Sequence, residues 1–257
     1  MISLRFTEPV GPAGAPLLVL GPSLGTSTIL WETATPALAE RYRVVAWDLP
    51  GHGASAPADE GFTVADLADA VAASIDERTF LYAGVSLGGA TGLELLLRHP
   101  DRVRAAAIVA SGAKLGTPES WAERAAQVRA QSSSSVIIGS AQRWFAEGSI
   151  ARIPELSGRL LHALQDADDE SYALCCEALA RYDVRERLER ITAPVLAVWG
   201  RHDQVAPEAK AQEIAERVAD GRTVVIEDAA HLPPAEQPDA TARALRDFFD
   251  PLTGGIR

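Results

Sequence analysis

Cysteine is scarce in this chain of 257 residues, where only Cys175 and Cys176 occur. Because the two residues are adjacent, a bridge between them would be strained and would join no distant segments. The sequence therefore excludes a disulfide framework, which is the expected condition of a protein in a reducing compartment.

Long apolar runs are also missing. The N-terminus reads Met1-Ile2-Ser3-Leu4-Arg5 and has no basic stretch followed by an apolar one. No part of the chain has the roughly 20 consecutive apolar residues of a membrane-spanning helix. We therefore expect neither a signal peptide nor a membrane span, and we expect a soluble protein of the cytoplasm.

The chain has fewer basic than acidic residues. The chain has 24 basic and 35 acidic residues, which gives a formal net charge of -11. An acidic surface repels phosphate backbones and anionic membrane surfaces. Nucleic acid and membranes are therefore not expected as partners, whereas a pocket for a small substrate can still carry its own local charge.

Hydrophobic residues make up 47% of the chain, which is enough for a core between a sheet and two helix layers. Several short runs are almost continuously apolar rather than alternating. Such runs are typical of strands buried on both faces of a parallel sheet. The predicted strands are residues 17–20, 44–47, 80–85, 105–109, 195–199 and 224–226.

Helical patterns alternate with these strands. After Thr63, a suitable N-cap, apolar residues recur every three or four positions. Further helices are predicted near residues 87–98, 207–218 and 238–249. This alternation predicts an α/β fold with a mostly parallel, doubly wound sheet. Residues 2–7 are expected to add an antiparallel edge strand.

One long segment interrupts the alternation. Residues 114–191 show helical patterns but no strand pair, and they lie between two core strands. The segment could merely cover the sheet, or it could form a cap over an active site. Ligands of open α/β sheets bind beyond the carboxyl ends of the strands, which favours the cap. We expect a single domain, with a core of residues 1–113 and 192–257 and a helical cap of residues 114–191.

The motif G-x-S-x-G occurs at Gly84-Val85-Ser86-Leu87-Gly88. A nucleophilic serine must stand exposed at a sharp turn from a strand into a helix, and the glycines relieve the crowding at that turn. The motif follows a predicted strand and precedes a predicted helix, as this geometry requires. Ser86 is therefore the predicted nucleophile.

A serine hydroxyl needs a base, and in this architecture an acid and then a histidine follow it along the chain. Asp203 comes just after the strand at 195–199, and His231 just after the strand at 224–226. We predict that His231 takes the serine proton and that Asp203 orients and stabilises the histidine ring.

Other residues compete for these roles. Asp228 is the rival acid, but it lies so close to His231 in sequence that the pairing would be strained. Of the remaining histidines, His52 is expected to pack in a loop, His99 to lie at the surface and His202 to belong to a turn. His162, in the insertion, could line a pocket or face solvent.

An oxyanion hole needs two backbone N–H donors near the developing charge. The residue after the nucleophile, Leu87, is expected to supply one. The loop after the first strand, Gly21-Pro22-Ser23-Leu24-Gly25, is expected to supply the other. Pro22 has no N–H, so Ser23 is the preferred donor and Leu24 the next. The alternative is that this loop is an ordinary glycine turn with no role in an oxyanion hole, and the same residues would fit it.

These motifs resemble those of α/β hydrolases, and the insertion is similar to that of the 3-oxoadipate enol-lactonases. The resemblance covers almost the whole chain. In the core it rests on Ser23-Leu24-Gly25-Thr26, Asp48-Leu49-Pro50-Gly51-His52-Gly53, the serine motif and Ala230-His231-Leu232. In the insertion it rests on the stretch from Lys114 to Trp121, Arg143-Trp144-Phe145, the stretch from Tyr172 to Leu179, and Asp183-Val184-Arg185.

The resemblance implies hydrolysis of the ring ester of 3-oxoadipate enol-lactone in aromatic-compound catabolism, without a metal or organic cofactor. The implied substrate is a small anionic lactone. Leu24, Arg143 and Trp144 are expected to contact it, with Trp144 against the ring and Arg143 near the carboxylate. Trp144 could equally be cap core, and Arg143 a solvated helix face. The chain departs from the family at Gly21-Pro22, where Ser-Asn is frequent.

Two other functions remain open at this stage. Another carboxylic-ester hydrolase or a perhydrolase would use the same machinery, since fold does not determine substrate. A ligand receptor of the same fold would instead keep the triad but turn its ligand over slowly, and a partner protein would recognise its cap. The expected assembly is a monomer or a small homo-oligomer.

Overall fold

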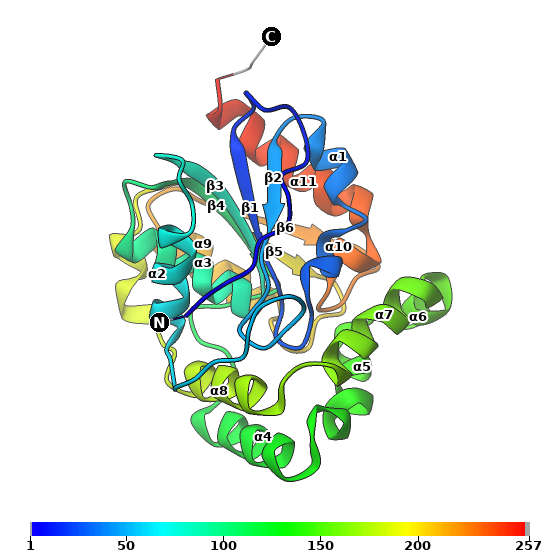
Figure 1. Ribbon diagram of the computed structural model, residues 1–257. Coiled ribbons are helices and arrows are strands. Elements are labelled where there is room, and N and C mark those ends of the chain that lie inside the picture. The colour runs from blue at the N-terminus through cyan, green and yellow to red at the C-terminus, as the bar shows by residue number, and fades with distance from the viewer. Residues whose placement is uncertain (1, 255–257) are drawn as a thin grey trace.

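The computed structural model describes residues 2–254, and a parallel sheet is at its centre (Figure 1). The strands of this sheet lie in the order β2-β1-β3-β4-β5-β6, and every neighbouring pair is parallel. Their bounds are β1 Leu17–Gly21, β2 Arg43–Ala46, β3 Phe80–Val85, β4 Val103–Val109, β5 Val195–Gly200 and β6 Gly221–Ile226.

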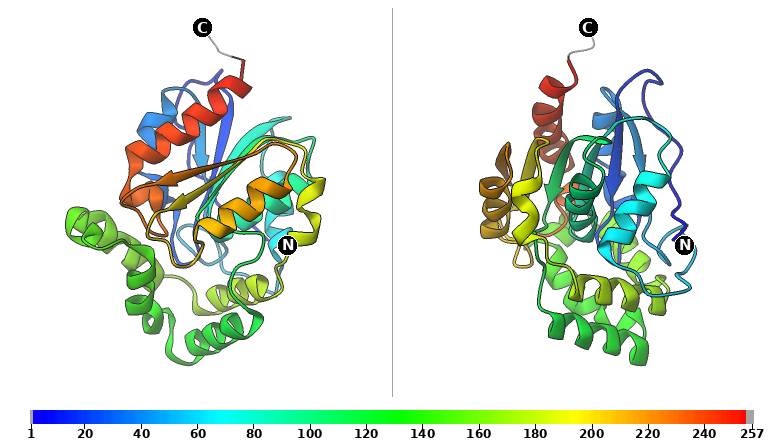
Figure 2. Two further views of the ribbon diagram at one scale, coloured as in Figure 1. Left: turned by 180° about the vertical axis from the view of Figure 1, so that it is seen from behind. Right: turned by 90° about the vertical axis from the view of Figure 1, so that its left-hand side faces the viewer.

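Helices cover both faces of the sheet, as the views in Figures 1 and 2 show. One face carries α1 (Thr35–Ala39) and α11 (Pro238–Phe249). The other carries α2 (Val64–Ala73), α3 (Leu87–Arg98) and α9 (Glu208–Arg217). Because helices lie on both sides, the central strands β1, β3 and β5 are buried along their whole length. The predicted doubly wound α/β-hydrolase fold is confirmed.

Helix α2 begins where the sequence predicts. The Thr63 side chain accepts a hydrogen bond from the Asp66 N–H at 3.2 Å, and the Asp66 carboxylate accepts one from the Thr63 N–H at 2.8 Å. This reciprocal capping satisfies two N–H groups that a helix N-terminus leaves open. Thr63 is therefore the N-cap.

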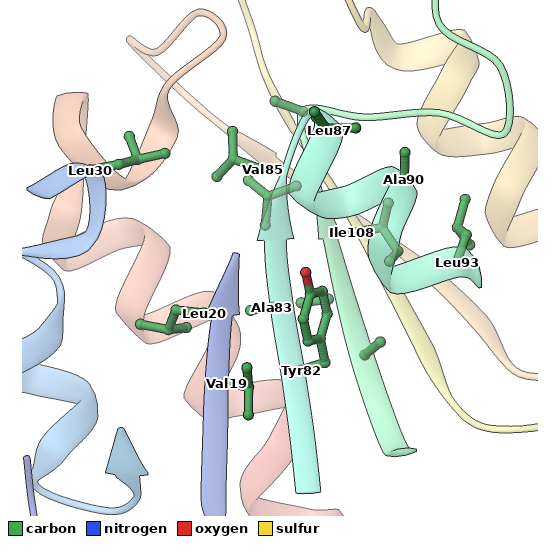
Figure 3. Close-up of a cluster of buried hydrophobic side chains, with 14 of the residues drawn as sticks. Val19, Leu20, Leu30, Tyr82, Ala83, Val85, Leu87, Ala90, Leu93 and Ile108 are labelled. Carbon is green, nitrogen blue, oxygen red and sulfur yellow. The ribbon is translucent and has the colours of Figure 1, made fainter. Parts of the chain in front are cut away.

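The core beneath the serine motif is formed by β1, β3, β4 and α3 (Figure 3). The side chains of Val19, Tyr82, Leu93 and Ile108 are almost fully buried there. Burying each large apolar side chain contributes about 1.5–3 kcal/mol relative to exposure. The Tyr82 hydroxyl donates to the Gly88 carbonyl at 2.8 Å, so the core also holds the first turn of α3 against β3.

The N-terminal segment differs from the expected edge strand. Residues 2–10 form only two isolated antiparallel bridges, Phe6 with Trp47 and Val10 with Val44. Pro9 lies between them and has no N–H to donate, which interrupts a regular ladder.

The segment after β4 is helical and lies beyond the carboxyl ends of the strands, at the bottom of Figure 1. Two of its helices, α4 and α8, pack side by side, and Arg129 of α4 binds Glu170 and Glu177 of α8. The α-helices are α4 Pro118–Gln131, α5 Ile137–Trp144, α6 Ser149–Arg152, α7 Pro154–Gln165 and α8 Asp169–Ala180. Shorter turns are η2 Ser133–Val136 and η3 Arg185–Arg190.

Three short elements complete the structure: η1 Thr28–Trp31, α10 Pro233–Glu236 and η4 Asp250–Leu252. Cys175 and Cys176 are free thiols buried within α8. Among residues 2–254, no helix has both the length and the apolar character required to cross a membrane.

Candidate active site

Ser86 stands at the sharp turn from β3 into α3. Its backbone has φ 55° and ψ -112°, a region that non-glycine residues rarely adopt. The turn is possible only because its flanks are glycines: a Cβ on Gly84 would overlap the Gly88 backbone, and a Cβ on Gly88 would lie 2.5 Å from the Pro22 carbonyl oxygen. The motif therefore has the strained geometry that a serine nucleophile requires.

Neighbouring groups hold this strained turn in place. The Ser86 N–H donates to the Val109 carbonyl at 2.9 Å, and the Ser111 hydroxyl donates to the Ser86 carbonyl at 2.7 Å. No hydrogen bond to another group of residues 2–254 occupies the Ser86 hydroxyl. The side chain is thus available to a substrate.

A cavity of about 540 Å³ opens beside Ser86. His231 also lines it, so the predicted nucleophile and base face the same space. Its walls come from the loop after β1, from α4 and α5, and from the loops that follow β5 and β6. The main lining residues are Ser23, Leu24, Ser86, Trp121, Arg124, Arg143, Trp144, Val205 and His231.

Asp203 and His231 meet directly although 28 positions separate them in sequence. The His231 Nδ1 lies 2.9 Å from the Asp203 Oδ2. The other carboxylate oxygen accepts the N–H groups of Val205 and Ala206 at 2.7 and 3.1 Å. Burial by itself would raise the pKa of Asp203, but the His231 ring and these two donors hold it below its ordinary value. Asp203 is therefore a charged acceptor.

The backbone around His231 is tied to the segment after α5. Glu236 is buried, and its two carboxylate oxygens accept the Ala230 and Ala146 N–H groups, each at 2.7 Å. The His231 N–H donates to the Trp144 carbonyl at 3.2 Å. These bonds hold the histidine loop against the helical segment above the sheet. Sequence reasoning did not identify Glu236.

The competing residues lie elsewhere. Asp228 is exposed, adopts a φ of 55° and makes no contact with His231 among the described hydrogen bonds and ion pairs. His162 and His202 are exposed. His99, at the end of α3, pairs with the partly exposed carboxylate of Asp69 in α2. The structure therefore brings together Asp203 and His231 rather than the alternatives.

His52 is buried behind the loop that follows β1. The Gly25 N–H donates to its Nε2 at 3.2 Å, so Nδ1 carries the proton and donates to the Pro50 carbonyl at 2.8 Å. The ring also stacks on Tyr172 of α8, with 6.0 Å between centroids. His52 thus supports the loop as a neutral imidazole.

The donors near Ser86 differ in one respect from the prediction. The Ser23 N–H donates to the Thr26 hydroxyl at 3.0 Å and is therefore engaged. In residues 2–254, neither the Leu24 N–H nor the Leu87 N–H has a hydrogen-bond acceptor. Leu24, the second choice in sequence, is the better match for a free donor because the Thr26 side chain already occupies Ser23.

His52 should make the protein sensitive to acid. Burial lowers its pKa to about 4 from an ordinary 6.5. Between these values the unfolded chain binds a proton that the folded chain does not, so stability falls as pH drops through this window. We expect His52 to account for roughly 3 kcal/mol of that loss.

Urea unfolding of wild type and His52→Gln between pH 7 and pH 4 measures this effect. The variant should show a clearly flatter dependence of unfolding free energy on pH. The exposed His162→Gln should keep the wild-type dependence. Parallel curves for wild type and His52→Gln would contradict the assignment.

The predicted cap residues occupy the cavity wall. Arg143 is half-buried, and burial together with the charge of Arg124 lowers its pKa. Trp144 is 4% exposed and packs edge to face with Phe145 at 6.4 Å, so it belongs to the core while still lining the cavity. Leu24 lines the same space.

Two cavity residues escaped the sequence analysis. Trp121 and Arg124 are three positions apart on α4 and so share one face of this helix. The Arg124 guanidinium lies 5.9 Å from the Trp121 ring centroid. Their spacing was visible in the sequence, but only the folded segment shows that this face of α4 is turned toward Ser86.

Comparisons with known proteins identify the family of this chain. Residues 16–238 match a family model described as alpha/beta hydrolase fold. The chain is 35% identical over 238 residues to 3-oxoadipate enol-lactonase 2 of Acinetobacter baylyi, covering 91% of this chain and 89% of the relative. It is 32% identical over 244 residues to a pimeloyl-[acyl-carrier protein] methyl ester esterase of Neisseria meningitidis, covering 91% of each.

A solved structure is similar over almost the whole chain. The enol-lactonase from Burkholderia xenovorans is 31% identical, with a TM-score of 0.91 and coverage of 96% of both chains. The predicted resemblance to enol-lactonases is confirmed, and these relatives support hydrolysis of a carboxylic ester. The chain belongs to the α/β-hydrolase family, in which it resembles the 3-oxoadipate enol-lactonases.

Proposed function

We propose that this protein hydrolyses the ring ester of 3-oxoadipate enol-lactone to 3-oxoadipate, as a cytoplasmic step in β-ketoadipate catabolism of aromatic compounds. The observation that carries the proposal is the cavity of about 540 Å³ that Ser86 and His231 share, with Asp203 bound behind the histidine. The likeness to enol-lactonases along the chain supports the choice of substrate.

In the acylation step, Ser86 Oγ attacks the lactone carbonyl while His231 Nε2 takes its proton. The bond between the carbonyl carbon and the ring oxygen then breaks, and His231 returns the proton to that oxygen. The leaving enol stays attached because it belongs to the same molecule, and it tautomerises to the ketone. Asp203 keeps the proton of the neutral ring on Nδ1 and stabilises the imidazolium.

The oxyanion formed at the carbonyl needs two donors. We assign them to the Leu87 N–H, at the positive end of α3, and to the Leu24 N–H in place of Ser23. Both groups are without a protein acceptor in residues 2–254. His52 holds the adjacent Gly25 N–H and so positions the second donor.

Water completes the reaction. It attacks the acyl carbonyl while His231 takes one of its protons. The ester bond to Ser86 then breaks, His231 returns the proton to Ser86 Oγ, and a second carboxylate is released. The helices of residues 114–191 act as the cap that encloses the substrate, with Trp144 against the ring and Arg143 near its carboxylate. The working assembly is a monomer or a small homo-oligomer.

The direct test is turnover of enzymatically generated 3-oxoadipate enol-lactone, followed by the loss of its ultraviolet absorbance. A neutral nitrophenyl ester serves as the comparison substrate. We expect kcat/KM for the lactone to exceed that for the neutral ester by at least about 100-fold, because only the lactone meets both the catalytic groups and the cationic wall.

Weak lactone turnover with rapid cleavage of the neutral ester would keep the catalytic groups but reject the lactonase assignment. A methyl ester of a dicarboxylic acid would then be the next substrate to assay. Absence of turnover with both substrates would favour the ligand-receptor function.

A further inference from the structure

Two guanidinium groups line the cavity from neighbouring helices. Arg124 projects from α4, Arg143 projects from α5, and both share the cavity with Ser86 and His231. The chain as a whole is strongly acidic, with a formal net charge of -11. The two arginines therefore give the cavity wall beside Ser86 a positive charge, opposite in sign to the net charge of the chain.

Neither guanidinium is neutralised by the protein. Among residues 2–254, no carboxylate forms an ion pair with Arg124 or Arg143, whereas Arg129 on the same helix binds two glutamates. The acidic residue in the cavity lining, Glu123, is exposed and pairs with neither arginine. Arg124 forms one hydrogen bond, from Nη2 to the Ser140 hydroxyl at 2.9 Å, and its buried Nε has no partner.

Arg124 is nevertheless held in position. Its guanidinium lies 5.9 Å from the Trp121 ring centroid and 5.6 Å from that of Tyr172. Cation–π contacts of this kind stabilise a cation without using its hydrogen-bond donors. Arg143 has no such contact and is half-buried. Arg124 is thus the preorganised member of the pair, and Arg143 is the adjustable one.

Two partly desolvated like charges repel each other, and their burial is unfavourable without a counter-charge. The burial of Arg143 and the nearby charge of Arg124 both disfavour its charged form. An anion between the two groups would remove the repulsion and satisfy the open donors. A planar carboxylate matches the fork of a guanidinium in geometry as well as in charge.

We propose that Arg124 and Arg143 form a two-guanidinium subsite that binds a free carboxylate on the substrate, so that the enzyme selects esters and lactones bearing a second, ionised carboxyl group. The inference rests on the proposed ester hydrolysis at Ser86. Arg124 is the principal anchor, and Arg143 closes on the same group.

The test compares two lactones with the same enol-lactone ring. 3-Oxoadipate enol-lactone bears a carboxymethyl group, and α-angelica lactone has a methyl group in its place. For Arg124→Met, kcat/KM for the carboxylated lactone should fall roughly 10- to 100-fold, mainly through KM, because a charge-assisted contact is lost. Turnover of α-angelica lactone should change by less than about threefold, because that ring brings no charge to the subsite.

Arg143→Met should also lower kcat/KM for the carboxylated lactone selectively, but by less. Arg124→Lys should retain part of the affinity, because lysine keeps the positive charge but lacks the planar guanidinium that binds a carboxylate through two bonds. Arg129→Met is the matched control. It removes the ion pairs between α4 and α8 but lies outside the cavity lining, so it should not discriminate between the lactones.

Calorimetric titration with adipate tests the subsite apart from turnover. Adipate should bind to Ser86→Ala and bind at least about 10-fold more weakly to Ser86→Ala carrying Arg124→Met. Equal losses on both lactones, or unchanged adipate binding, would overturn the subsite while leaving ester hydrolysis in place. Wild type that hydrolyses neither lactone would overturn the proposed function, and adipate binding would still decide the subsite.

Discussion

Replacing Ser86 by alanine should reduce kcat for the lactone by roughly 10⁵- to 10⁶-fold, the loss expected when the nucleophile of a serine triad is removed. The strained turn between β3 and α3 presents the Ser86 side chain to the cavity that it shares with His231. The change should leave the fold intact, since alanine removes one atom and keeps the backbone bond to Val109.

Two measurements check this result. The first is single-turnover hydrolysis of the lactone with Ser135→Ala as the control, a serine that lines the same cavity from η2. The second is labelling with a fluorophosphonate, followed by mass spectrometry of the intact protein. Wild type and Ser135→Ala should gain the label, and Ser86→Ala should not. Labelling of Ser86→Ala would show that another residue is the nucleophile.

Replacing Asp203 by asparagine should lower kcat by roughly 10⁴-fold with little change in KM. The amide would present its NH₂ group to His231 Nδ1 in place of the carboxylate oxygen that now lies 2.9 Å away. The ring would then keep its proton on Nε2, where it cannot accept the proton of Ser86. The Val205 and Ala206 N–H groups would retain an oxygen acceptor, so the loop should stay folded.

Asp228→Asn is the matched control for this prediction, because Asp228 is the rival acid and lies exposed near His231 in sequence. Steady-state kinetics of the two variants should differ by three to four orders of magnitude in kcat, on the order expected from a lost triad acid. Equal losses in both variants would show that the pairing of Asp203 with His231 is not what supports catalysis.

The elements that carry the candidate site were predictable because their signals are local. Each buried strand appears in the sequence as a short apolar run. The observed strands contain five of the six predicted runs in full, and β2 ends at Ala46, one residue before the end of the predicted run 44–47. The turn at Ser86 can also be recognised from nearby residues, because its crowding requires Gly84 and Gly88 at fixed spacing. Carboxyl ends of parallel strands meet at one edge, so the positions of Asp203 and His231 followed from strand order.

The cavity wall was less predictable, because several side chains compete for each position there. Sequence favoured Ser23 as a donor, but only the folded loop shows that the Thr26 hydroxyl occupies its N–H. Sequence singled out Arg143, whereas Arg124 proves to be the better-held cation. A helical pattern shows which residues share a face but not which neighbour that face meets.

The sequence by itself determined the order of strands and helices, the strained serine turn and the residues that follow β5 and β6. These features depend on neighbours a few positions apart along one chain. The tertiary structure alone decided which N–H groups remain free. It also decided that Glu236 binds both Ala230 and Ala146, the second of which lies 90 positions before it. Such contacts depend on how separate segments pack against one another, and no local spacing specifies that arrangement.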